Sequence, residues 1–297
     1  MKKKSLRFKM IMGGVLTVVV PLLIVGGFSI YRASSALEEI SQSQSREVAR
    51  GLAAMANLAV QEELRTITQL AVREAVISAA ATRGISESTV ATDELTRFVQ
   101  SSGDMYETIS LVGLDGKVFA DGVNGRHKDL DLTDRDYFKS AKEGKASVGS
   151  VVKSKGSGNI VMTFGAPVYS DSRQITGVIV AIKNISFLSN KVAEIKLGQT
   201  GYGFISDKTG ACITHPNKDL ILKLNFTQVD GMKEIAARMI AGETGTAPYT
   251  FQGVKKIAGF APVPLSGWSV CVTQDYSEFM APARNLALLI GLLGLVF

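Results

Sequence analysis

The chain has 297 residues, 46% of them hydrophobic, and a formal net charge of +6. Five positive charges precede the first apolar segment, which leaves +1 for the rest of the chain: Lys2, Lys3, Lys4, Arg7 and Lys9. Without a basic stripe elsewhere, nucleic acid is not an expected partner. The two histidines, His127 and His215, lack the spacing of a metal site, and no nucleotide-binding loop or nucleophile motif is present. We therefore expect neither an enzyme nor a cofactor or metal.

Two uncharged apolar segments bracket the chain, at residues 10–31 and 285–297. Crossing ~30 Å of hydrocarbon takes ~20 apolar residues, so the first is long enough and the second is the beginning of another span. The basic flank predicts a cytoplasmic N-terminus and a large extracytoplasmic loop, anchored in the inner membrane by two spans. A cleaved signal peptide with small residues at 34–36 is the alternative, but its apolar region would be shorter, ~7–15 residues.

The predicted elements after the first apolar segment begin with a long amphipathic helix over residues 32–83. Its apolar residues recur at three- and four-residue steps, as in Leu52, Met55, Ala56, Ala59 and Val60. One domain is too short to cover such a helix, so we expect part of it to pair with a second copy of the chain. Residues 84–92 predict a loop and residues 93–100 a short helix.

From Thr108 onward the pattern alternates, which is typical of strands. A hairpin turns at Asp115 and Gly116 and is followed by a helix at residues 135–143. Three strands, at residues 147–153, 160–169 and 175–183, and a second helix at residues 187–195 come next. The order then recurs. Asp207 repeats the turn at Asp115, and Pro262 repeats Pro167 at nearly the same offset. We infer an α+β fold in which two copies of one module stack along the long helix.

The predicted helix of the first module, at residues 135–143, begins with a distinctive signature: Asp134-Arg135-Asp136-Tyr137-Phe138. With this order of elements, the chain resembles the double-Cache sensor region of bacterial methyl-accepting chemotaxis receptors over essentially its whole length. The resemblance implies two PAS-like modules with antiparallel sheets, a ligand in the distal module, and a homodimer. It divides the chain into a basic flank (1–9), a first span (10–31), and a stalk helix with its connection (32–92). A distal module (93–196), a proximal module (197–275), a return helix (276–284) and a second span (285–297) follow.

In relatives that bind amino acids, the arginine and tryptophan of this motif hold the ligand carboxylate. Carried over, Arg135 takes the arginine position, Tyr137 the tryptophan position and Phe138 that of the following tyrosine. The chain departs from the pattern at Leu130, where a tyrosine is common, and at residues 182–184, which lack the acid that holds the ligand ammonium. We therefore expect a small carboxylate, such as a short organic acid, rather than an amino acid.

The arginine side chain suits this ligand independently of the resemblance, because its planar fork binds a carboxylate through two hydrogen bonds. The full set of candidate ligand-binding residues is Asp134, Arg135, Asp136, Tyr137, Phe138, Tyr106, Lys153 and Asn184. The alternative is that the arginine pairs with a neighbouring aspartate at the surface while the two aromatic residues belong to the core.

The two cysteines are expected to be free thiols. In a PAS-like sheet the strands that hold Cys212 and Cys271 flank one central strand, which places them ~9–10 Å apart at ~4.8 Å per strand. A disulfide needs Cα atoms within ~7 Å.

For function, the first hypothesis is the sensor of a chemoreceptor that signals to cytoplasmic partners through a region after residue 297. The alternatives are the same sensor on a histidine kinase or cyclic-nucleotide enzyme, and a membrane-tethered binding protein without an output domain.

Overall fold

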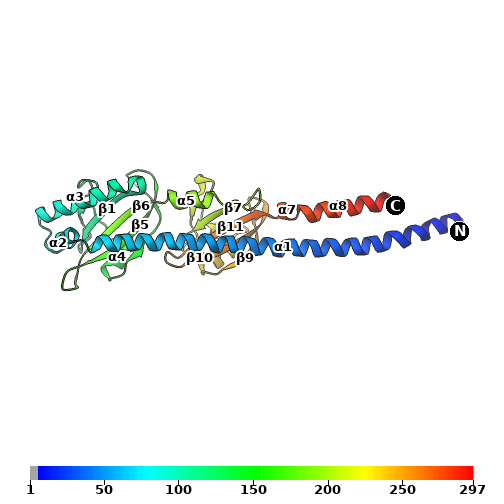
Figure 1. The fold of residues 1–297 in the computed structure, drawn as a ribbon, viewed down its shortest axis with the longest axis horizontal. Helices are drawn as coiled ribbons and strands as arrows, with labels where there is room; N and C mark the ends of the chain where they lie inside the picture. Colours follow the sequence, from blue (N-terminus) through cyan, green and yellow to red (C-terminus); the bar gives the residue numbers. More distant parts are fainter. Residues whose placement is uncertain (1–5, 155, 297) are drawn as a thin grey trace.

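The computed structural model describes residues 6–154 and 156–296. The molecule is elongated, with the helix α1 (Leu6–Ala71) running along its length and two antiparallel sheets stacked on it (Figure 1). The helix α8 (Ala281–Val296) lies beside the N-terminal part of α1, and both termini are at the same end. A methyl group at Gly26 of α1 would lie 2.7 Å from Ile290 Cγ2, so the two apolar helices are in direct contact.

Of the two expected membrane spans, the described residues contain a candidate for the first only. Within the described residues, α1 is the one helix whose length and apolar composition suffice to cross a bilayer. The apolar part of α8, Ala281–Leu292, is shorter than a span requires. Residues 1–5 of the basic flank and Phe297 of the second expected span lie outside the described residues.

One side of α1 packs against both sheets. Its buried side chains recur at helical spacing and include many small residues, which let the strands approach closely: Ala49, Leu52, Ala53, Ala56, Val60, Ile67 and Leu70. The approach is close at Gly259, where a Cβ would lie 2.2 Å from the backbone of Ser45. The long helix is therefore the spine of the molecule.

The helix ends at Ala71, earlier than the predicted residue 83, and two shorter helices follow, α2 (Glu74–Thr82) and α3 (Ile85–Ser101). The predicted loop over residues 84–92 is wrong, because the chain reverses within two residues. Arg83 takes the left-handed conformation (φ 51°) that ends α2, and Gly84 precedes α3. The buried face of α3, Ala91, Leu95 and Val99, then packs on the distal sheet.

The distal sheet has the strand order β2-β1-β6-β5-β3, with β4 also paired to β5. Its strands are β1 (Tyr106–Gly113), β2 (Val118–Asp121), β3 (Ser147–Val148), β4 (Val152–Lys153), β5 (Ile160–Tyr169) and β6 (Ile175–Asn184). One face packs on α1 and the other is covered by α4 (Asp136–Lys142). The predicted strand over residues 147–153 is therefore two short strands.

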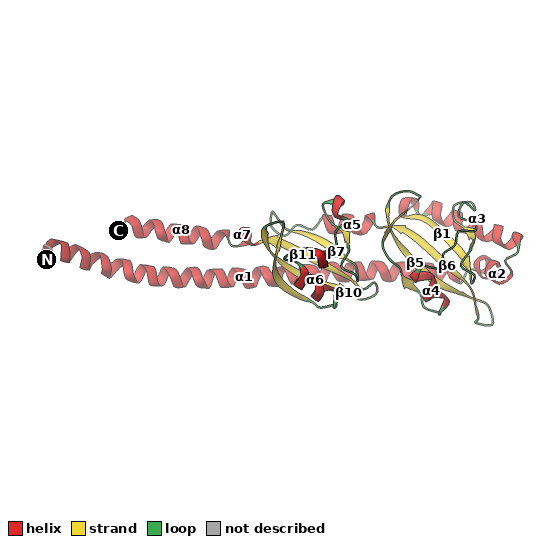
Figure 2. Ribbon diagram, turned by 180° about the vertical axis from the view of Figure 1, so that it is seen from behind, coloured by secondary structure: helices red, strands yellow, loops and turns green. Residues whose placement is uncertain are grey.

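The proximal sheet repeats this topology in the order β8-β7-β11-β10-β9. Its strands are β7 (Tyr202–Ser206), β8 (Cys212–Thr214), β9 (Gly245–Phe251), β10 (Val254–Val263) and β11 (Trp268–Asp275). The helix α5 (Ser186–Ala193) lies between the two sheets, α6 (Lys233–Ile240) packs on β10 and β11, and α7 (Tyr276–Phe279) leads into α8 (Figure 2). The described residues also include three short 3₁₀ helices, at Gly103–Met105, Lys218–Leu220 and Phe226–Gln228.

The matching strand orders show that both modules are built on the same antiparallel plan, as the sequence repeat predicts. Cys212 on β8 and Cys271 on β11 lie on either side of β7, and both are free and buried. The prediction of free thiols is confirmed.

Candidate functional site

The signature residues lie at the beginning of α4, on the face of the distal sheet away from α1. Arg135 is the residue before the first turn, in an extended conformation. The carboxylate of Asp136 accepts hydrogen bonds from its neighbour's amide, Tyr137 N (2.8 Å), and from Ser150 Oγ (3.1 Å). It thereby fastens the start of the helix to the segment between β3 and β4. The helix sits directly on β5, since a Cβ at Gly165 would lie 2.5 Å from the carbonyl oxygen of Tyr137.

Both aromatic residues of the signature are buried between α4 and the sheet. Tyr137 is 5% exposed and Phe138 2%, in a cluster with Val112, Val178 and Val180. Burial raises the pKa of Tyr137 to about 12, so its hydroxyl stays protonated across the physiological range and remains able to donate. These side chains form the apolar wall of the candidate site.

The side chain of Arg135 lies at the surface end of this cluster. It is 43% exposed, and its Nε is 3.3 Å from Asp134 Oδ1, a carboxylate that is itself 75% exposed. This is the surface pair that the alternative interpretation of the sequence describes. Such exposed pairs contribute little to stability, ~0–1 kcal/mol, so the guanidinium is held weakly.

Beneath α4, the sheet carries buried hydroxyl groups that the sequence reasoning did not single out. Thr108 and Ser110 of β1 are 1% and 3% exposed, with their Oγ atoms 3.5 Å apart. On β5, Thr163 Oγ1 donates to the carbonyl of Ser150 (3.2 Å). The signal for the first two was the alternation of polar residues with Ile109 and Leu111 along one strand. These hydroxyls give the face polar groups that can contact a ligand.

One buried carboxylate holds the loop that follows β2 in its folded conformation. Asp121 is fully buried and accepts three backbone N–H groups, from Val123 (2.9 Å), Gly125 (2.8 Å) and His127 (2.7 Å). Because its lone pairs are used by the loop, Asp121 acts as a structural anchor.

Of two further predicted residues, Asn184 lies on the same face of the sheet as the signature and Lys153 lies away from it. Asn184 is the last residue of β6 and shares the strand face of Val178 and Val180; its Oδ1 accepts from Ser186 N at 2.8 Å. Lys153 is exposed on β4, in the projecting β4–β5 hairpin, so the structure does not bring it to the buried cluster.

Tyr106 is a correction, since it faces α1 and not the candidate site. Its hydroxyl donates to Glu63 Oε1 on α1, and its ring packs on Phe98 at 5.7 Å between centroids. A β-bulge between Tyr106 and Thr108 reverses the strand alternation and turns the ring to the side of Ile109. On the same side, Lys183 forms an ion pair with Glu63 that links β6 to the stalk.

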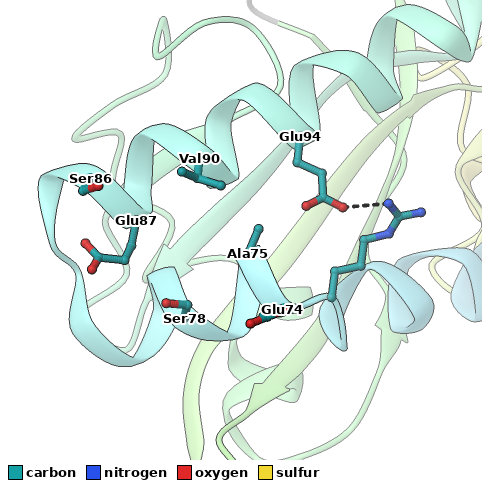
Figure 3. Close-up of a pocket in the computed structure, with 8 residues that line it drawn as sticks. Glu74, Ala75, Ser78, Ser86, Glu87, Val90 and Glu94 are labelled. Atoms are coloured by element: carbon teal, nitrogen blue, oxygen red, sulfur yellow. Dashed lines mark hydrogen bonds and ion pairs between the residues drawn. The ribbon is translucent and has the colours of Figure 1, made fainter.

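A groove of ≈ 640 Å³ lies at the outer tip, between α2 and α3 (Figure 3). Three glutamates line it, Glu74, Glu87 and Glu94, against one cation, Arg73, whose Nη1 is 2.6 Å from Glu94 Oε1. An acidic groove repels a carboxylate, so it does not match the ligand expected from the sequence. Within residues 6–154 and 156–296, no group of three His, Cys, Asp or Glu residues is arranged to hold a metal.

Comparison with known proteins places this architecture in a family. The Cache-domain family model matches residues 32–283. Methyl-accepting chemotaxis protein McpA of Bacillus subtilis (strain 168) is 22% identical over 302 aligned positions, covering 97% of this chain and 42% of McpA. The chain thus spans well under half the length of the curated relatives it matches first.

Two solved structures share the fold. The ligand-binding domain of Mlp24 with asparagine superimposes with a TM-score of 0.62 at 21% identity, covering 85% of this chain and 99% of that one. The extracellular domain of the putative histidine kinase mmHK1S-Z2 gives a TM-score of 0.65 at 16% identity, covering 82% of this chain and 99% of that one. The chain therefore belongs to the Cache-domain family, with a sensor region of the kind found in bacterial methyl-accepting chemotaxis receptors.

Proposed function

We propose that this chain is the extracytoplasmic sensing part of a transmembrane chemoreceptor, and that its distal module binds a small carboxylate at the start of α4. One observation carries the ligand class. Arg135 stands beside a hydroxyl-bearing, aromatic-walled face of the sheet and is paired with the exposed carboxylate of Asp134. The guanidinium is thus placed for an anion and is held in place by a partner that a ligand can replace.

The energies favour that replacement. An exposed ion pair contributes ~0–1 kcal/mol, while a hydrogen bond to a charged group in a partly dry site contributes ~1.5–3 kcal/mol. A ligand carboxylate held bidentately by Arg135 against Tyr137 therefore gains more than the loss of Asp134 costs. Binding would draw the arginine inward from its half-exposed position.

The end of β6 bears on whether the ligand also has an ammonium group. Asn184 occupies this position with a neutral amide, and the adjacent Lys183 is turned toward α1, where it pairs with Glu63. An α-ammonium would find no countercharge from either side chain, which favours an organic acid. The asparagine bound by Mlp24 makes amino acids the competing class.

A screen by thermal shift separates these classes. The chain in detergent would be heated with short organic acids, amino acids and amines, since a ligand of the native state raises Tm by an amount that grows with the logarithm of its excess over Kd. We expect hits among organic acids, and Arg135→Ala should weaken them by ~2–5 kcal/mol. Arg97→Ala, an exposed arginine on α3, is the matched control. Hits confined to amino acids, or an unchanged affinity in Arg135→Ala, would contradict the proposal.

The apolar helices define the proposed topology. We place the N-terminal part of α1 and the adjoining α8 in the inner membrane, with the N-terminus in the cytoplasm, because the basic flank precedes the first of them. Signals would then reach cytoplasmic partners through the contact between these two helices.

A homodimer along α1 is also proposed. Gly51, Ala54 and Leu58 form an exposed strip of small and apolar residues on the stalk, and Leu58 is 64% exposed. Leu58→Cys should cross-link two copies under mild oxidation, without interference from the two native cysteines, which are buried. Ser172→Cys, in the exposed β5–β6 turn, should not; equal cross-linking at both positions would indicate random collision.

A sensor histidine kinase is the second candidate, favoured by the fold shared with mmHK1S-Z2. Chimeras that join this chain to the cytoplasmic part of a chemotaxis receptor or of a histidine kinase would test it. Ligand-dependent output from the receptor chimera alone supports the first proposal, and from the kinase chimera alone the second.

A further inference from the structure

The proximal module contains a cavity of its own, which the distal site does not use. It measures ≈ 340 Å³ and lies on the face of the proximal sheet away from α1, the face equivalent to that of the distal signature. Its lining combines rings and aliphatic groups with a few polar side chains: Tyr202, His215, Pro216, Asn217, Leu220, Phe251, Gln252, Val254 and Lys256. This combination is typical of a small-molecule site.

His215 gives this cavity a hydrogen-bond donor. His215 Nδ1 accepts the backbone N–H of Asn217 (2.9 Å), so the neutral imidazole carries its proton on Nε2. Burial keeps the ring neutral by lowering its pKa, and the ring lies edge-on to Tyr202 at 5.1 Å.

Lys256 supplies the one charge in the lining. Its side chain is 9% exposed, its ammonium lies 5.1 Å from the centre of the Tyr202 ring, and it pairs with Asp275. An ammonium has three N–H donors, and Asp275 accepts from one of them. The remaining donors, together with His215 Nε2–H, can receive a single anionic group.

The pair has no counterpart in the distal module. Asp275 is the last residue of β11 and lies opposite Lys256, whereas in the distal sheet the last residue of β6, Asn184, lies opposite Val161. The proximal module therefore has a buried cation where the distal module has an aliphatic side chain. Two modules with one topology thus present different chemistry.

We infer that the proximal module is a second ligand site, for a monocarboxylate with a small apolar body. The carboxylate binds Lys256 and His215, and the apolar body lies against Leu220, Phe251 and Val254. One cation selects one negative charge, and the volume admits a molecule of about the size of benzoate. This site is independent of the distal proposal, because none of its residues lies in the distal module.

Its position connects it directly to α7 and α8. Asp275 is followed at once by α7, and Lys255, beside Lys256, places its ammonium 3.8 Å from the centre of the Tyr276 ring in that helix. A carboxylate that binds the remaining donors of Lys256 lies beside Asp275, the residue from which α7 starts. A ligand here modulates the same helix that the distal module is proposed to move.

The sequence has two histidines, and His215 lies at the site, so its ring NMR signal can report ligand binding directly. The chain would be labelled with ¹³C-histidine, without a histidine tag, and its ring signals in detergent assigned with His127→Gln. Titration with acetate, butyrate and benzoate should shift the His215 signal saturably, with tighter binding as the apolar body grows. Benzamide, which has the shape of benzoate without its charge, should bind at least about tenfold more weakly.

Variants assign the shift to this cavity. The paired change Lys256→Gln with Asp275→Asn removes both charges at similar size and should weaken binding at least about tenfold. An unchanged His127 signal would show that the fold is retained. Arg135→Ala should leave the His215 titration unchanged. The inference is overturned if no probe gives a saturable shift, if the paired variant binds as the parent does, if benzamide binds as well as benzoate, or if Arg135→Ala abolishes the shift.

Discussion

The buried ion pair between Glu63 on α1 and Lys183 on β6 sets a measurable cost for detaching the stalk from the distal sheet. The two side chains are 4% and 14% exposed, and the hydroxyl of Tyr106 donates to the other oxygen of the same carboxylate. Burial, and the hydrogen bond to Glu63, raise the pKa of that hydroxyl, which therefore remains a donor. Removing Glu63 leaves a partly buried ammonium and a buried hydroxyl without their acceptor.

Breaking a buried pair in this way typically costs ~3–5 kcal/mol. The ammonium of Lys183 would still lie over the rings of Tyr106 (5.0 Å) and Phe187 (5.3 Å), and such contacts retain ~0.5–2 kcal/mol. We therefore expect Glu63→Ala to cost about 3 kcal/mol, at the lower end of the range. Tyr106→Phe removes one hydrogen bond to a charged group and should cost ~1.5–3 kcal/mol.

The double variant Glu63→Gln with Lys183→Met separates pairing from packing. It removes both charges together, so its stability should lie within about 1 kcal/mol of the parent chain. Urea unfolding in detergent, followed by circular dichroism, gives the free energy of unfolding of the parent chain and of each variant. A cost below about 1 kcal/mol for Glu63→Ala, or a double variant as unstable as the single one, would refute the coupling between stalk and sheet.

Three other predictions concern packing, charge and thiols. Gly165→Ala places a methyl group against the backbone of α4 and should cost ~1–3 kcal/mol in a thermal melt. The ion pair with Arg83 lowers the pKa of Asp115 from 3.8 to about 2. The pair therefore stabilises the folded chain fully above pH 3.8, and this stabilisation is lost as the pH falls through 2. Because the pair is exposed, Asp115→Asn should lower the free energy of unfolding by under ~1 kcal/mol at pH 7 and should have no effect below pH 2. Burial raises the pKa of Cys212 to about 12 and also raises that of Cys271, so neither should react with a maleimide until the chain unfolds.

Much of the fold follows from local pattern. The strand predicted over residues 160–169 is β5 as observed, because its alternation and flanking turns are strong signals. The positions of Cys212 and Cys271 followed from topology, since the repeated module fixes which strand lies between them. Repeats and periodicity can be read from a single sequence, and here they correspond to the matching strand orders and to the strand β5.

Long-range and irregular features were not predictable. The turn at Arg83 depends on a left-handed backbone conformation that no sequence pattern indicates, so the sequence predicts a loop where α3 begins. The bulge after Tyr106 reversed the face on which that ring lies. The partner of Lys183 is Glu63, on a helix far away in sequence, and no local pattern indicates such a pair.

The candidate site shows the same division. The signature at the start of α4 marked the region, and burial of Tyr137 and Phe138 agrees with both a ligand wall and a core. The sequence could not decide whether Arg135 faces a ligand or Asp134, because both outcomes use the same residues at the same spacing. The structure shows the pair with Asp134, and the ligand role stays a proposal.

The end of β6 joins the proposed ligand site to the stalk through two consecutive residues. Asn184 lies on the ligand face, and Lys183, one residue earlier, points to the opposite face and pairs with Glu63 on α1. A ligand shifts a conformational equilibrium only through its different affinity for the two states, so the shift must reach the membrane through contacts that differ between them. If Lys183 and Glu63 are such a contact, Glu63→Gln with Lys183→Met should keep ligand affinity in the thermal-shift assay. The same variant should lose the ligand response in the receptor chimera, and an undiminished response would show that the signal takes another route.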